Sequence, residues 1–190
     1  GIEITILSRR IALMTQVSIT TSTNYNGPLN AVVEDEETKL TFRFALDQPA
    51  PAGGLKVYLD SNVVQSLNRL SLQPLLTDPD ATENIDVSKS TLEENNSAIA
   101  ATIAAGASFA TITLPVFNNE EPDTFLPETF DGLTEVTFTL KTADQVSGVN
   151  GISDYTVNPS ATNSLVLFAD TADQLPSTPT VSISATPTDL

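Results

Sequence analysis

The sequence contains no cysteine and no histidine, and these two absences restrict its chemistry. Without cysteine the chain can form no disulfide, no thiolate metal site and no thiol nucleophile. Without histidine it lacks the usual ligand of zinc, copper and haem, and the usual base that activates a serine or threonine nucleophile. Metals that bind through oxygen, such as calcium, remain possible because carboxylate and carbonyl oxygens suffice for them.

Basic residues and tryptophan are also scarce. The 190 residues include 8 Lys and Arg against 24 Asp and Glu, a net charge of −16, and no tryptophan. Such a chain repels nucleic acid and anionic membranes, so its expected small partners are cations. No apolar pocket is apparent that would raise the pKa of one carboxyl group, and we expect a non-catalytic protein. A glycoside hydrolase with a carboxylate pair is the least favoured alternative.

Alternating apolar residues predict an all-β domain. The pattern is clearest in segment 109–141, which reads as a strand, an acidic loop and a second strand. Similar stretches between turn residues predict further strands, and a final strand apolar on both faces suits the inside of a sandwich. The residues expected to face the core are Val17, Ile19, Leu40, Phe42, Phe44, Leu46, Leu55, Val57, Leu59, Ala110, Ile112, Leu114, Val116, Val136, Phe138, Leu140, Tyr155, Val157 and those from Leu165 to Ala169.

The connections between these strands carry specific expectations. Loop 47–54, with the sequence DQPAPAGG, is expected to join its flanking strands as a hairpin. Residues 61–100 form an irregular insert, in which helical spacing favours short helices at 63–70 and 92–104. Residues 98–117 carry no charge, but Gly106 and Pro115 interrupt them. We therefore expect a buried strand preceded by a turn there, and no membrane insertion.

A short internal repeat bears on the domain organisation. The sequence Val-Ser-Ile-Ser at 181–184 nearly repeats Val-Ser-Ile-Thr at 17–20, and it follows a linker. The next copy of a tandem array would begin at that place. We therefore expect an upstream flank at 1–14, one domain at 15–173, and a linker with the first strand of a following repeat at 174–190.

The order of these segments resembles the Calx-beta family. The matching segments are VVEDEETKLTFRFAL at 32–46, AAGASFATITLPVFNNEEPD at 104–123, TEVTFTL at 134–140 and NSLVLFAD at 163–170. They span most of residues 15–173 in the family's order. Members are immunoglobulin-like sandwiches found as tandem modules, among others in bacterial surface or secreted proteins. The resemblance implies an antiparallel β-sandwich of immunoglobulin type and an extracellular or cell-surface location.

In Calx-beta domains calcium binds at one pole of the sandwich, and the resemblance implies the same here. Carried over by position, the ligand candidates are Glu34, Asn118, Asn119, Glu121, Glu128, Asp170 and Asp173, with Glu135 as an alternative to Glu128. Parallel strands ending near 117 and 169, and a strand starting at Thr38 in the opposite direction, would bring these segments to one pole.

The chain departs from the family pattern after the LPV strand, where Asn118 and Asn119 stand in place of paired aspartates. Asparagine donates a carbonyl oxygen to calcium but no charge, so we expect weak binding, with a dissociation constant on the order of 0.1 to 1 mM. The expected function is a structural or adhesion repeat that binds calcium ions and contacts neighbouring repeats. A metal-free acidic spacer and a ligand-recognition module are the alternatives, because acidic loops are often merely solvated.

Overall fold

The computed structural model describes residues 14–63, 70, 85–86, 99–116, 132–146 and 153–177. These residues form strands and two short 3-10 turns. The strands are β1 (Thr15–Thr23), β2 (Ala31–Val33), β3 (Lys39–Leu46), β4 (Leu55–Ser61), β5 (Ile85–Asp86), β6 (Ile99–Ile103), β7 (Phe109–Pro115), β8 (Thr134–Lys141), β9 (Tyr155–Val157) and β10 (Asn163–Ala169). The turns η3 (Ala143–Gln145) and η4 (Ala172–Gln174) follow β8 and β10. The repeated segment at 181–184 and the flank at 1–13 lie outside the described residues.

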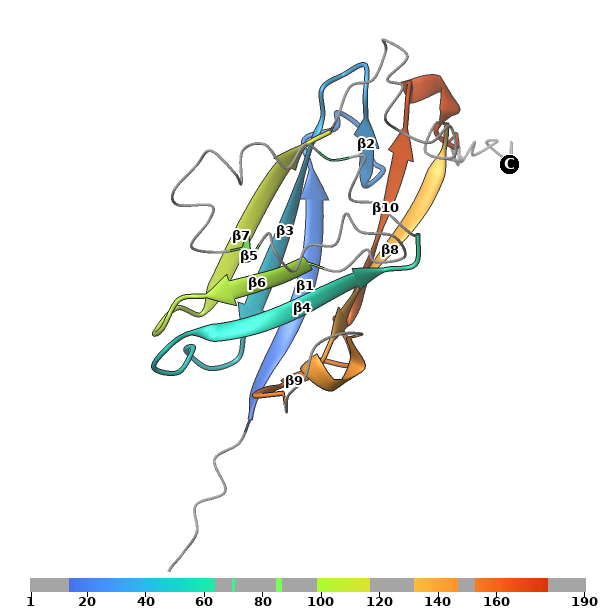
Figure 1. Ribbon diagram of the computed structural model, residues 1–190. Helices are drawn as coiled ribbons and strands as arrows, with labels where there is room; N and C mark the ends of the chain where they lie inside the picture. The colour runs from blue at the N-terminus through green and yellow to red at the C-terminus, as the bar shows by residue number, and fades with distance from the viewer. Residues whose placement is uncertain are drawn as a thin grey trace, which may run out of the picture.

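The strands form two sheets that share one core (Figure 1). One sheet has four strands in the order β7-β3-β1-β9, and the other has six in the order β2-β10-β8-β4-β6-β5. The long strands pair antiparallel, which confirms an all-β, sandwich-like arrangement. The short strands β2 and β9 instead pair parallel to β10 and β1, so the expectation of a wholly antiparallel sandwich is wrong there. These partners are far apart in the sequence, and no tight turn imposes an antiparallel direction on them.

Alternating apolar side chains from both sheets fill the space between them. In β3, Phe42 and Phe44 are fully buried while Arg43 is exposed. The ring of Phe42 meets that of Phe138, from the other sheet, edge to face with centroids 4.9 Å apart and planes at 85°. The predicted inward residues of β1, β3, β4, β7 and β8 are all buried.

Strand β10 lies inside the larger sheet, between β2 and β8, as its apolar sequence predicts. Its residues from Val166 to Ala169 are buried, whereas Leu165 is 50% exposed. The strand is therefore covered on both faces only over its second half, toward the pole where β2 pairs with it.

Loop 47–54 does not form the expected hairpin, because β3 and β4 belong to different sheets. The loop crosses between the sheets and is held by backbone hydrogen bonds, from the Asp47 N–H to the Gln16 carbonyl at 3.1 Å and from the Ala50 N–H to the Ala107 carbonyl at 2.8 Å. Both strands bury one apolar face in the shared core. The alternation of apolar residues predicts which face of a strand is buried, but it does not predict which strand is its hydrogen-bonded neighbour.

The predicted helix at 92–104 is wrong over the residues that the structure describes. Residues 99–103 form β6, which pairs antiparallel with β4 and with β5. Alanine favours helices in isolation, but strand pairing and the complete burial of Ala100 and Ala101 override that preference. The interior of the predicted helix at 63–70 lies outside the described residues. Its last residue, Leu70, makes an isolated bridge with Val116.

Within the described part of the chain, no helix is long and apolar enough to cross a membrane.

Replacing Gly54 with alanine is expected to destabilise the fold more than replacing Gly53. Both glycines have a positive φ, +80° and +90°, so either substitution costs about 1 to 2 kcal/mol through backbone conformation alone. A Cβ atom on Gly54 would also lie 2.8 Å from the Ile103 carbonyl oxygen, whereas nothing lies within 4 Å of one on Gly53. Urea unfolding of both variants measures the difference. Equal losses would mean that the β4–β6 ladder shifts to accept the side chain.

Candidate functional site

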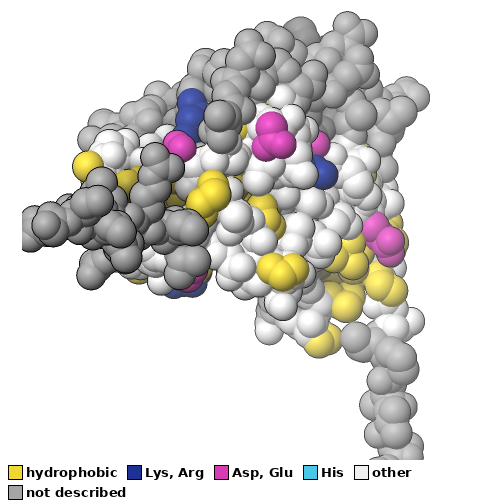
Figure 2. Space-filling model, turned by 90° about the horizontal axis from the view of Figure 1, so that it is seen from below, with side chains coloured by type: hydrophobic (Ala, Val, Ile, Leu, Met, Phe, Trp, Pro, Cys, Tyr) yellow, Lys and Arg dark blue, Asp and Glu magenta, His cyan; other side chains and the backbone are white. Residues whose placement is uncertain are grey.

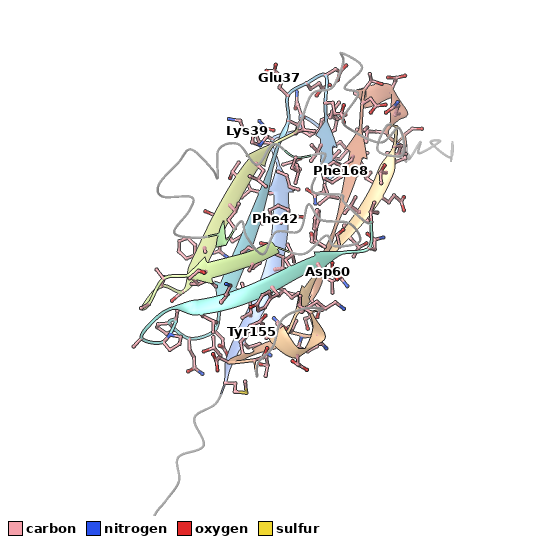
Figure 3. All side chains as sticks on the ribbon, viewed as in Figure 1. Glu37, Lys39, Phe42, Asp60, Tyr155 and Phe168 are labelled. Carbon is pink, nitrogen blue, oxygen red and sulfur yellow. The ribbon has the colours of Figure 1, made fainter. Side chains whose placement is uncertain are left out.

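Four consecutive carboxylates form a tight turn between β2 and β3. The Glu37 N–H donates to the Glu34 carbonyl at 3.1 Å, and the Thr38 N–H donates to the Val33 carbonyl at 3.3 Å. Glu37 adopts a φ of 52°, the left-handed conformation that closes the turn. The turn, here called the acidic tip (residues 34–37), stands at one end of the molecule, where Figure 3 labels Glu37.

The acidic tip has one buried carboxylate and three exposed ones. Glu34 is 4% exposed, whereas Asp35, Glu36 and Glu37 face solvent. The difference follows from position, because Glu34 directly continues the buried strand β2 while the next three residues form the turn itself. Glu34 is therefore the residue of the acidic tip whose carboxylate could bind a ligand within the protein surface, away from bulk solvent.

Backbone hydrogen bonds join the acidic tip to the end of β10. The Glu34 N–H donates to the Ala169 carbonyl at 3.0 Å, and the Asp35 N–H donates to the Asp170 carbonyl at 3.1 Å. These bonds extend the parallel ladder of β2 and β10 beyond both strands. The structure thus brings together two of the segments that were expected to share a pole.

The side chain of Asp170 is hydrogen-bonded to two residues around it. Its Oδ2 accepts hydrogen bonds from the Gly132 N–H at 2.8 Å and from Gln174 Nε2 at 3.0 Å. The Asp170 N–H in turn donates to Gln174 Oε1 at 2.8 Å. Asp173 lies nearby in η4, where its exposed carboxylate accepts a hydrogen bond from the Thr171 hydroxyl.

The acidic segment between β7 and β8 begins and ends at this same pole. At its start, the Val116 N–H donates to the Thr38 carbonyl at 2.8 Å. At its end, Gly132 is bonded to Asp170. The candidates within it, Asn118, Asn119, Glu121 and Glu128, lie outside the described residues.

Glu135 is not brought into this group. It is an exposed residue of β8, paired with Leu167 of β10, and its position alternates with that of the buried Val136. Its side chain therefore belongs to the outer face of the larger sheet, whereas that of Glu34 is buried.

The donor chemistry of this pole suits a hard cation, but the described residues supply only part of a coordination shell. Calcium takes about 6 to 8 oxygen ligands. Among the described residues no group of three or more acidic side chains is close enough to hold a metal. The backbone hydrogen bonds join the segment of Glu34 and Asp35 to that of Ala169 and Asp170, so the carboxylates of these two segments are the candidates for a shared site.

The opposite pole differs in charge. Figure 2 views the molecule from that end and shows scattered acidic side chains, some of them beside Lys or Arg, among apolar and uncharged ones. Asp47, Asp144 and Asp154 are exposed, and they come from the loop after β3, from η3 and from the segment before β9. Consecutive carboxylates are thus a feature of the Glu34 pole within the described chain.

Two residues of this pole, Gly132 and Gln174, were not predicted from sequence. A signal for Gln174 exists, because the tetrapeptide Thr-Ala-Asp-Gln occurs at both 142–145 and 171–174. Both copies form 3-10 turns within a few residues of the end of a strand, and in both the glutamine Oε1 accepts a hydrogen bond from a backbone N–H that precedes the turn, that of Thr142 or Asp170. The tetrapeptide is a turn motif that the chain uses twice.

Comparison with known proteins found no family model that matches this chain, no similar curated protein and no similar solved structure.

Proposed function

We propose that this chain is a non-catalytic β-sandwich module of the immunoglobulin-like, Calx-beta type, which binds calcium at the pole around Glu34 and Asp170. The observation that supports the proposal most is the hydrogen bonding from the acidic tip to Ala169 and Asp170. These hydrogen bonds place Glu34, whose carboxylate is buried, next to the turn that carries Asp170. The motifs that resemble Calx-beta domains supply the second support.

The proposed ligands within the described residues are the carboxylates of Glu34 and Asp170. Oxygen donors of this kind select calcium or magnesium over softer metals. Calcium held between them would tie the turn after β2 to the end of β10, and it would offset the repulsion among the crowded carboxylates of the acidic tip. The expected consequence is a stiffer pole.

The setting that suits such a module is a repeat in a larger extracellular or cell-surface protein. A calcium concentration near or above the millimolar range would fill even a weak site there. Its proposed partners are calcium ions and neighbouring repeats of the same chain. The alternative function is that of a metal-free acidic spacer.

Calcium is expected to raise the thermal midpoint of unfolding. At about 10 mM calcium, a dissociation constant on the order of 0.1 to 1 mM gives about 1.4 to 2.7 kcal/mol of stabilisation. For a domain of this size that corresponds to a rise of about 3 to 10 °C. Calorimetry in chelator, in calcium and in magnesium at equal ionic strength measures the effect.

The isosteric variants Glu34→Gln and Asp170→Asn test the position of the proposed site. Each should remove most of the calcium-dependent rise, while Asp144→Asn, at the opposite pole, should retain it. Equal midpoints of the unsubstituted protein in all three solutions would rule out the calcium function and leave the acidic spacer.

A further inference from the structure

The outer face of the four-stranded sheet differs in charge from the chain as a whole. Strands β1, β3, β7 and β9 contain no Asp or Glu. Their only charged residues are Lys39 and Arg43, and both side chains are exposed. In a chain with a net charge of −16, this face is a local excess of positive charge.

The register of the sheet surrounds Arg43 with hydroxyl groups. Six outward residues, here called the hydroxyl face, are Thr20, Ser22, Thr41, Arg43, Thr111 and Thr113. Thr20 and Thr111 are the cross-strand neighbours of Arg43, and Ser22, Thr41 and Thr113 form the adjacent row. Each hydroxyl can both donate and accept a hydrogen bond. The hydroxyls of Thr41 and Thr113 lie 2.8 Å apart and bond to each other, and each keeps further capacity to donate or accept. The face therefore offers an ordered set of donors and acceptors.

The guanidinium of Arg43 is held in place by Phe109. Its central carbon lies 4.8 Å from the centroid of the Phe109 ring, a cation–π contact. Phe109 is itself 53% exposed, so the pair stands on the surface. A stacked guanidinium keeps its planar N–H donors for a partner, and the strands of this sheet offer it no carboxylate.

We propose that the hydroxyl face binds a carboxylate-bearing polysaccharide. Arg43 would pair with a sugar carboxylate through two parallel N–H bonds, the strongest form of this contact. The threonine and serine hydroxyls would exchange hydrogen bonds with the sugar hydroxyls, and the exposed part of Phe109 would cover an apolar patch of the sugar ring.

A protein partner fits this face less well. Stable protein interfaces have an apolar, often aromatic centre with a polar rim. Here the arrangement is reversed, because hydroxyls and Arg43 occupy the middle and Phe109, the first residue of the edge strand β7, stands at a corner. A ligand that is polar throughout its length matches that distribution better.

The net negative charge of the chain does not prevent such binding. The acidic tip lies beyond Lys39, which is about 13 Å from Arg43 along the strand. At physiological ionic strength charges are screened over about 8 Å. A carboxylate in direct contact with Arg43 is therefore attracted by Arg43 more strongly than it is repelled by the tip.

Binding of polygalacturonate, a linear sugar polymer with one carboxylate per residue, tests the proposal. Affinity electrophoresis of the full chain would be run in chelator, since calcium crosslinks this polymer and since the result must not depend on the calcium function. Neutral dextran and polyglutamate are the comparison ligands.

We expect polygalacturonate alone to retard the protein. Arg43→Gln should weaken it about 10- to 100-fold, because a charged hydrogen bond is lost, while Lys141→Gln, on the larger sheet, should leave it unchanged.

A double variant, Thr111→Val with Thr113→Val, separates sugar recognition from simple charge attraction, because it keeps every charge and removes two hydroxyls. It should also weaken binding. Equal retardation by polyglutamate would overturn the proposal in favour of an acidic protein segment. Absence of binding to polygalacturonate, or binding insensitive to Arg43→Gln, would overturn it outright.

Discussion

Replacing Phe42 with alanine is expected to lower the free energy of unfolding by about 3 to 5 kcal/mol. Phe42 is fully buried in the middle of β3, and its ring contacts that of Phe138 from the opposite sheet at 4.9 Å. The substitution removes a large apolar surface and leaves a cavity between the two sheets. The hydrogen-bonded strands on both sides cannot readily move inward to fill this cavity. It also removes an aromatic pair worth about 0.5 to 1.5 kcal/mol beyond burial.

Phe109→Ala is the matched control for this prediction, because the same side chain is removed from an exposed position of a neighbouring strand. Its cost should stay below about 1 kcal/mol. Guanidinium unfolding followed by circular dichroism measures both variants. Similar losses would contradict the position of Phe42 at the centre of the core.

Replacing Tyr155 with phenylalanine is expected to cost about 1 to 3 kcal/mol, although it deletes a single oxygen atom. Tyr155 belongs to the four-stranded sheet, and its buried hydroxyl reaches the other one. It accepts a hydrogen bond from the Tyr58 N–H at 3.0 Å and donates one to the Lys141 carbonyl. Tyr58 and Lys141 face each other across β4 and β8, so the hydroxyl bridges this strand pair from the opposite sheet. Its loss leaves the buried Tyr58 N–H without an acceptor.

The same residue gives a pH dependence with a defined sign. Burial raises the pKa of Tyr155 well above its ordinary value of 10.0. Above about pH 10 the unfolded chain releases this proton while the folded protein keeps it, so the free energy of unfolding falls as pH rises. Below that pH both states are protonated and the contribution is constant. The stability difference between the protein and Tyr155→Phe should therefore narrow above about pH 10.

Tyr25→Phe is the control, because Tyr25 lies only half-buried in the segment after β1. It should change the free energy of unfolding at neutral pH by no more than about 0.5 kcal/mol. If Tyr155→Phe is as stable as the unsubstituted protein, then β4 and β8 close to form a direct bond between Tyr58 and Lys141.

The sequence alone predicted the strands that bury one face, for a simple physical reason. In β3, β7 and β8 the side chains alternate between core and solvent, and each buried position is apolar. The alternation therefore predicts both the strand and its inward face. The convergence of Thr38, Val116 and Ala169 at one pole was also predictable, because strand directions follow from the order of the strands in a sandwich.

Partner choice and the insert were not predictable in the same way. Nothing in loop 47–54 distinguishes a hairpin from a crossing between sheets, since both place the apolar faces of β3 and β4 in the core. The alanines of β6 favour a helix locally, and only their pairing with β4 decides the matter. Ligand sets are harder still, because they depend on side chains from several loops whose mutual distances no short motif encodes.

The crossing of loop 47–54 between sheets is part of a wider pattern with a kinetic consequence. Among the described strands, only β5 and β6 are neighbours in the chain and also partners in a sheet. The other ladders join strands that are not consecutive, from β1 with β3, where Thr23 lies beside Leu40, to partners as distant as Ala31 with Leu167 and Thr15 with Tyr155. A nascent chain therefore has almost no local hairpin from which to grow, and loops must close before most of the ladders form. Proteins of this kind fold in about milliseconds to seconds, not microseconds, and their unpaired strands are exposed to other chains during that interval.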